Sequence, residues 1–193
     1  MRFRSALAVA VALAVSYACG GSPSGPSGAS GSLTMMLKDS PYSDAKSLLV
    51  TFSDVSVHRS DQPDDGWTKL PFAAGATSRT CDLKKLQNAQ DILGTGPLTA
   101  GHYTQVRLTV TGSVLYFDQA ASGDPCGTSI TAPSGRSSTL DIPSGQVKLN
   151  REFDVAAGGA TTMLLDFDGD KSVHETGNGR FMMSPVIGVE SVK

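Results

Sequence analysis

The sequence is poor in the residues and motifs on which catalysis and metal binding usually depend. Its three histidines, His58, His102 and His174, lie far apart, and none has a neighbour at the spacing of zinc ligands. It contains no G-x-S-x-G elbow, no Walker loop and no dinucleotide-binding fingerprint. A Ser-His-Asp triad can assemble from distant positions, so a hydrolase with a scattered triad is kept as a third functional hypothesis. The scarcity of motifs predicts a protein that is not an enzyme.

Clusters of basic residues are also absent. Lys and Arg together number 16 against 18 Asp and Glu, and the closest basic pair is Lys84 and Lys85. Proteins that bind nucleic acids concentrate Lys and Arg on one surface or stretch, because affinity for phosphates depends on these charges. The sequence therefore predicts no nucleic acid partner.

No apolar run is long enough to cross a bilayer as a helix, although the sequence begins with a shorter one. Two arginines precede the apolar run 6–15, and the segment 16–18, Ser-Tyr-Ala, leads directly to Cys19. A basic start, a short apolar core and a small residue before cysteine are typical of a bacterial lipoprotein signal. We therefore predict a signal peptide over residues 1–18 and lipidation of Cys19, with ordinary cleavage at the same bond as the alternative.

A stretch without any large apolar side chain follows the cysteine. Residues 20–32, GGSPSGPSGASGS, contain only Gly, Ser, Pro and Ala. Such a chain behaves as a flexible tether with an end-to-end distance of about 20 Å. Gly20, in place of Asp, favours the outer membrane over the inner membrane as the destination. The predicted location is the bacterial cell envelope, with the membrane as a partner through the N-terminal lipid.

Only two cysteines are left once Cys19 is assigned to lipid. Cys81 and Cys126 form an even pair, and an exported protein folds in an oxidising compartment. We predict a disulfide bond between them, which would stabilise the fold by roughly 3–4 kcal/mol. The alternative is two free thiols.

Strand patterns dominate the remainder, residues 33–193. Short runs of alternating apolar and polar residues follow one another, separated by turns rich in Gly, Pro and Asp. Within 46–59 the alternation slips near positions 53–54, which predicts a β-bulge or bend. Helix-like spacing in 82–93 predicts one short helix in a connection. The pattern predicts one all-β domain, an antiparallel β-sandwich of immunoglobulin-like or transthyretin-like type.

The segment 163–192 contains two apolar runs that flank a polar loop, and it predicts a long β-hairpin that closes the sandwich. Gly177, Asn178 and Gly179 supply residues that tolerate positive φ in this loop.

The same segment contains the best candidate for a metal site. Asp166, Asp168 and Asp170 alternate along the first arm, and Asn178 lies across the hairpin. Carboxylate and amide oxygens are the ligands that Ca²⁺ prefers, but the spacing lacks the Gly and the final Glu of an EF-hand loop. The competing hypothesis is structural, with the Asp side chains capping turns.

Aromatic residues on strands offer a second candidate site. Trp67, Tyr42, Tyr103 and Tyr116 would form a sugar-binding platform if they shared a surface, whereas aromatics on strands usually pack in the core or across strands.

The order of segments resembles a known family. The strings CDLKKLQNAQDILGTGPLTAGHYTQVRLTV and LLDFDGDKSVHETGNGRFMMSPVIGV carry the resemblance, which extends over residues 32–192. In the second string a hydrophobic-Asp-Phe-Asp element precedes Ser-Val and then Thr-Gly-Asn-Gly-Arg. The chain is similar to the bacterial lipoprotein family catalogued as domain of unknown function 4382. The resemblance implies an envelope-associated, sandwich-like domain with no established activity.

These observations favour a non-catalytic binding or scaffolding module of the cell envelope, whose protein or glycan partner the sequence does not identify. The second hypothesis is a Ca²⁺-stabilised carbohydrate-binding or adhesion domain.

Overall fold

A computed structural model describes residues 28–40, 43–128 and 130–193 of the chain. The predicted signal peptide, Cys19, the tether up to residue 27 and Tyr42 lie outside the described residues.

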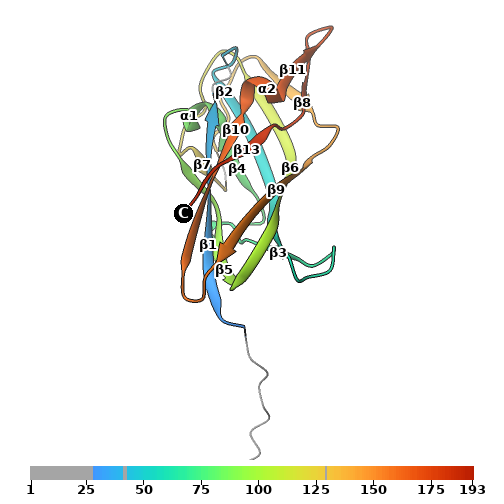
Figure 1. Cartoon of the computed structure of the whole chain (residues 1–193). Coiled ribbons are helices and arrows are strands. Elements are labelled where there is room, and N and C mark those ends of the chain that lie inside the picture. Colours follow the sequence, from blue (N-terminus) through green and yellow to red (C-terminus); the bar gives the residue numbers. More distant parts are fainter. Residues whose placement is uncertain (1–27, 41–42, 129) are drawn as a thin grey trace, which may run out of the picture.

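Two sheets make up the domain (Figure 1). The four-stranded sheet has the order β13 (Ile187–Val192), β10 (Ala160–Asp168), β1 (Ser30–Ser40) and β5 (Asp91–Thr99). The main path of the larger sheet runs through β11 (Val173–Thr176), β12 (Arg180–Met183), β8 (Ser137–Asp141), β6 (Gly101–Tyr116), β2 (Ser47–Arg59), β4 (Arg79–Asp82) and β7 (Cys126–Gly127). In the same sheet, β3 (Trp67–Lys69) pairs with β2, and β9 (Gln146–Val155) pairs with β6. The helices are α1 (Leu83–Leu86), α2 (Gly169–Ser172) and the 3₁₀ turn η1 (Ala73–Gly75).

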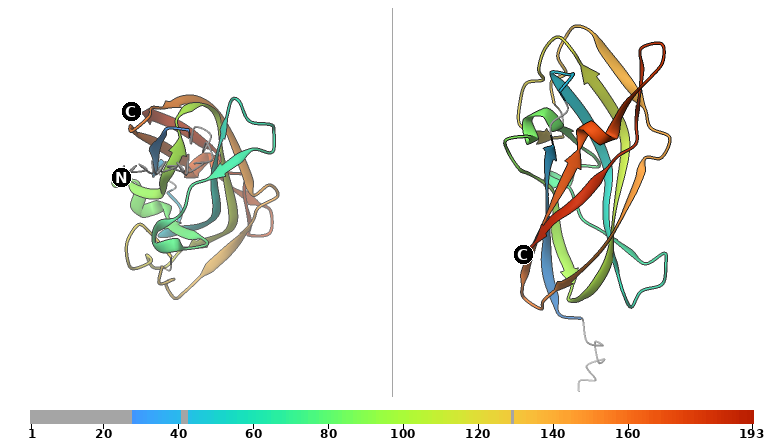
Figure 2. Two further views of the ribbon diagram at one scale, coloured as in Figure 1. Left: turned by 90° about the horizontal axis from the view of Figure 1, so that it is seen from below. Right: turned by 45° about the horizontal axis from the view of Figure 1, so that its top comes forward.

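The two sheets pack face to face and enclose the core, as the end-on view in Figure 2 shows. The predicted all-β sandwich is therefore confirmed. Two of its strand pairs are parallel, β1 with β10 and β12 with β8, so the sheets are mixed and not purely antiparallel. No helix in the described part of the chain is long and apolar enough to span a membrane.

Side-chain alternation sets the inner face of each sheet, because successive residues of a strand point to opposite sides. Leu33, Met35 and Leu37 of β1 are fully buried, and their neighbours along the strand are partly exposed. The other strands contribute inward residues in the same way, among them Leu48, Val50, Phe52, Val106, Leu108, Met163, Leu165 and Phe167.

The predicted bulge in the second strand is confirmed. The pairing of β2 with β6 shifts register between Phe52 and Asp54. One extra residue in a strand reverses which positions face inward. Phe52 and Val55 are consequently both buried, although their positions differ in parity.

The short helix predicted within 82–93 is confirmed, and it is a single turn between β4 and β5. α1 contains only Leu83–Leu86, capped by the Asp82 carboxylate, which accepts a hydrogen bond from the Lys84 N–H. Residues 91–93 belong to β5, which pairs with β1. Backbone pairing with a distant strand outweighed the local spacing of leucines. The second helix, α2, was not predicted.

The predicted closing hairpin is correct in its first arm and at the end of its second arm, whereas Phe181 and Met183, predicted in the second arm, belong to β12 and do not pair with β10. β10 and β13 pair antiparallel, as expected for the arms. The intervening residues leave this sheet, form α2 and build a second hairpin, β11–β12, which joins the larger sheet through β8. The turn of that second hairpin has positive φ at Asn178 and Gly179, as the residue types predict.

The first strand begins at Ser30, ahead of the predicted domain boundary at Leu33. Its start is held against the turn at residues 156–159, since the Ser32 N–H donates to the Gly159 carbonyl and the Gly158 N–H donates to the Ser30 carbonyl. A Cβ at Gly31 would lie 2.4 Å from the Ala156 carbonyl oxygen. Only glycine fits where the chain enters the sandwich.

Cys81 and Cys126 form a disulfide bond, as predicted, with an S–S distance of 2.07 Å. Both cysteines are buried, and they join β4 to β7. The bond attaches the long loop around β7 to the edge of the larger sheet.

Removal of this bond should destabilise the domain without changing its fold. The cross-link closes a sequence separation of 45 residues, so Cys81→Ala/Cys126→Ala should lower the free energy of unfolding by about 3–4 kcal/mol. Denaturant unfolding of the wild type under oxidising and reducing conditions, next to the double variant, measures this. If all three samples unfold at one denaturant concentration, the disulfide contributes nothing.

Candidate functional site

Asp166 lies on the outer face of the four-stranded sheet, and its carboxylate already contacts neighbouring side chains. It pairs opposite Lys38 in the parallel ladder of β1 and β10. The Lys38 ammonium lies 3.8 Å from the Asp166 carboxylate and also pairs with Glu190. The Ser40 hydroxyl donates to both carboxylate oxygens of Asp166 at 3.2 Å.

Asp168 caps α2. Its carboxylate accepts hydrogen bonds from the Lys171 N–H at 3.0 Å and from the Lys171 ammonium at 2.7 Å. The hydrogen bond from the ammonium is the main cause that lowers the pKa of Asp168 below its usual range. This is the turn-capping role that formed the alternative to metal binding.

The four predicted cation ligands are not gathered into one site. Asp170 is exposed in the first turn of α2, and Asn178 is exposed at the turn between β11 and β12. Among the described residues, no group of three His, Cys, Asp or Glu side chains has an arrangement that could hold a metal ion.

Of the predicted aromatic residues, Trp67 and Tyr103 line one cavity of about 280 Å³, but among the described residues they do not form an exposed platform. Tyr103 is buried and stacks on Phe153, with ring centroids 5.2 Å apart. The Arg107 guanidinium covers the ring of Trp67 at 3.7 Å, and His58 packs against the same ring. The indole N–H donates to the Asp64 carbonyl. Trp67 therefore fills a packing role on the outer face of β2, β3 and β6.

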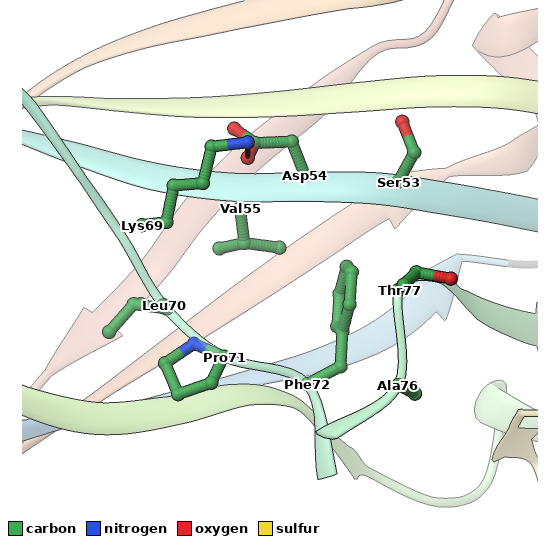
Figure 3. Close-up of a pocket in the computed structure, with 9 residues that line it drawn as sticks. All are labelled: Ser53, Asp54, Val55, Lys69, Leu70, Pro71, Phe72, Ala76 and Thr77. Atoms are coloured by element: carbon green, nitrogen blue, oxygen red, sulfur yellow. Dashed lines mark ion pairs between the residues drawn. The ribbon is translucent and has the colours of Figure 1, made fainter. Parts of the chain in front are cut away.

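A small cavity of about 290 Å³ lies between the bulge of β2 and the chain segment after β3 (Figure 3). Asp54 and Lys69 are its charged residues, and they neutralise each other across 2.8 Å. Val55 and Phe72 provide apolar surface. Its size is at the lower end for small-molecule sites, and its charges already have partners.

One buried acid lacks such partners. Asp39 at the end of β1 is only 4% exposed, and neither carboxylate oxygen has a hydrogen bond to a described residue. The Gly169 N–H and the Gln87 amide lie close enough to act on the charge, although they do not reach hydrogen-bond geometry. Removal from water raises the pKa of Asp39 to about 8.

Asp82 shows how a buried carboxylate is satisfied in the same fold. It is fully buried, and it accepts hydrogen bonds from the Ser47 hydroxyl, the Leu48 N–H and the Lys84 N–H. Burial raises its pKa, while these hydrogen bonds oppose the rise. Asp82 is a structural link between β2 and α1, whereas Asp39 has no comparable explanation.

β9 and β13 are edge strands of the two sheets and lie near each other (Figure 1). A groove between them consists of two cavities of about 320 and 370 Å³ that share Lys148. We call it the lateral groove; it is lined by Pro143, Ser144, Gln146, Val147, Lys148, Leu149, Asn150 and Arg151 on one side and by Ser184, Pro185, Ile187, Gly188 and Val189 on the other. This surface was not predicted, because the sequence does not show which strands lie at sheet edges.

The fold and its surfaces define a two-sheet β-sandwich domain with an open groove along one side. The chain matches the model of the family described as "Domain of unknown function (DUF4382)" over residues 30–185. It therefore belongs to this family, as the resemblance of its segments had indicated.

No curated protein matches the sequence. A crystal structure of a leucine-rich repeat protein from Bacteroides thetaiotaomicron VPI-5482 is similar at 16% sequence identity and a TM-score of 0.27, and the match covers 70% of this chain and 13% of that one. A likeness at that score supports no argument about fold or function.

The buried acid gives the domain a specific pH dependence. Asp39 is charged in the unfolded chain above pH 4 but binds a proton in the folded state up to about pH 8. The folded state therefore holds more protons in this window, and the free energy of unfolding should fall as the pH rises through it. Asp39→Asn should remove this fall and stabilise the protein by up to about 5 kcal/mol above pH 8.

Denaturant unfolding at several pH values between 4 and 9 measures the effect. Asp124→Asn, which removes an exposed carboxylate, is the matched control and should leave the wild-type slope unchanged. An Asp39→Asn protein with the same pH profile as the wild type would show that Asp39 is ionised and solvated in the folded state.

Proposed function

We propose that the protein is a lipid-anchored, non-catalytic binding or scaffolding module of the bacterial cell envelope, and that its anchor lies in the outer membrane. The observation that carries this proposal is the order of its N-terminal segments. A basic start, a short apolar run, Cys19 and a stretch of Gly, Ser, Pro and Ala stand directly before the first strand of the sandwich.

The position of that first strand supports the proposal. β1 begins at one end of an elongated domain, next to the turn at residues 156–159 (Figure 1). An attachment at this end would leave the sides and the far end of the sandwich accessible. The lateral groove lies on one of these sides.

The described side chains also favour binding over catalysis. The ring Nε2–H of His58 donates to the Pro63 carbonyl, and His102 pairs with Asp154 on the surface, so each contacts a group unrelated to a nucleophile. The lateral groove extends along β9 from Pro143 to Arg151 and is open to solvent, which suits a chain-like ligand better than a small substrate.

Lipidation of Cys19 is tested by the mass of the mature N-terminal peptide. Two or three acyl chains hold a protein stably on a membrane, whereas one does so only marginally. We expect a diacylglyceryl or triacyl adduct on Cys19 and partitioning of the mature protein into the detergent phase. Cys19→Ser should move the protein to the aqueous phase or leave it uncleaved. An unmodified N-terminus at Cys19 would refute the anchor.

The calcium hypothesis is tested by thermal unfolding with Ca²⁺ and with a chelator. A ligand at 100 times its dissociation constant adds about 2.7 kcal/mol to the stability of the folded state. We expect the same midpoint in both solutions, because Asp166 and Asp168 already pair with lysines. A higher midpoint with Ca²⁺ that Asp168→Asn abolishes would contradict this and favour the Ca²⁺-stabilised adhesion domain.

A further inference from the structure

We propose that the lateral groove binds an extended, acidic peptide segment of a partner protein, which adds as a strand to the edge of β9. This inference rests on the proposed binding function and specifies the class of ligand.

The backbone of β9 presents unpaired groups to the groove. β9 pairs with β6 on one side, and in the described part of the chain no strand pairs with its other side. The Val110 N–H donates to the Gly145 carbonyl, so the backbone groups of Gly145 point toward β6. Because these directions alternate along a strand, those of Gln146, Lys148 and Asn150 point away from β6 and into the groove. The Ser144 hydroxyl donates to the Gln146 carbonyl, so the groups that an added strand could use are mainly those of Lys148 and Asn150.

The backbone of β13, on the opposite wall of the groove, also has an edge that pairs with no described strand. β13 pairs only with β10 among the described strands. The Asp168 N–H donates to the Val186 carbonyl, which places the backbone groups of Val186 toward β10. The alternation then directs those of Ile187 away from β10. Extended peptides bind to such free edges through main-chain hydrogen bonds.

Apolar side chains form the floor of the groove. Val147 and Leu149 alternate with exposed residues along β9, and they are partly buried against the core. Val189 packs against the core from β13. A bound strand would place every second side chain on this floor, so apolar residues should alternate with polar ones in the ligand.

The charges of the groove select the polar residues of the ligand. Lys148 and Arg151 are exposed, and neither has an ion pair with a described residue. The described residues that line the groove include no acid. A segment with Asp or Glu at the positions that face these two residues would gain attraction and meet no repulsion.

This charge pattern argues against two other occupants. Pairing of β9 with β9 of a second copy would bring Lys148 and Arg151 close to the same residues of the other copy, and like charges across a ladder destabilise it. The predicted tether has neither acidic nor large apolar side chains to contact the rim or the floor.

Binding can be measured with the mature full-length protein in a non-ionic detergent. The probe is a fluorescein-labelled nine-residue peptide that alternates Glu and Val, and the readout is fluorescence anisotropy. The controls are a peptide that alternates Lys and Val and a Glu/Val peptide in which every backbone nitrogen is methylated, so that neither of its edges can donate to β9.

Of the three peptides, we expect only the unmodified Glu/Val peptide to bind, with an affinity that falls as the salt concentration is raised. Lys148→Glu/Arg151→Glu should weaken binding by roughly tenfold or more. Lys46→Glu/Lys69→Glu makes the same change in net charge away from the groove and should leave the affinity unchanged.

Equal binding of the N-methylated peptide would overturn strand addition. Equal binding to both double variants, or no binding of the Glu/Val peptide, would overturn the proposal. A concentration-dependent dimer in sedimentation that Lys148→Glu/Arg151→Glu changes would assign the groove to a second copy and also overturn it. The mass of the N-terminal peptide in the same sample tests the lipid anchor independently. Failure of peptide binding by the lateral groove can therefore be distinguished from failure of the proposed anchored module.

Discussion

The parallel pairing of β1 with β10 is the constraint on which the rest of the domain depends. The two strands lie at opposite ends of the sequence, and they form the centre of the four-stranded sheet. Parallel neighbours cannot be joined by a tight turn, so the chain between them has to travel away and return. Most of that intervening chain forms the larger sheet. Met35, Leu37, Leu165 and Phe167 fix the register from the inside, because a slip of one residue would turn each of them outward.

This arrangement also creates the lateral groove. β9 and β10 follow each other in sequence but belong to different sheets, and the turn at 156–159 holds their ends together. β13 extends the small sheet beyond β10 and runs beside β9 without pairing with it (Figure 2). The sandwich is therefore left with two strand edges on one side. Edges of this kind attract other strands unless charges or irregular backbone protect them, and Lys148 and Arg151 provide charge of one sign.

Local patterns predicted the features that depend on neighbouring residues. The alternation in β1, the bulge after Phe52 and the turn at Asn178 could all be inferred from adjacent positions. The features that depend on distant partners were missed. Helical spacing in 82–93 did not reveal that β5 pairs with β1, and the aspartates of β10 looked like metal ligands because Lys38 could not be placed beside them. Asp39 could have been found, since it continues the inward parity of Leu33, Met35 and Leu37.

The central place of β1 has a mechanical consequence. β1 is flanked by β5 on one side and by β10 on the other, and it is also the strand that follows the proposed lipid anchor in sequence. The hydrogen bonds on both flanks lie across the strand direction. A pull on the N-terminal end of β1 therefore acts along the strand and loads many of these bonds in shear at the same time. The domain would resist such a force as a unit, whereas a hairpin pulled apart at its open end breaks one bond after another.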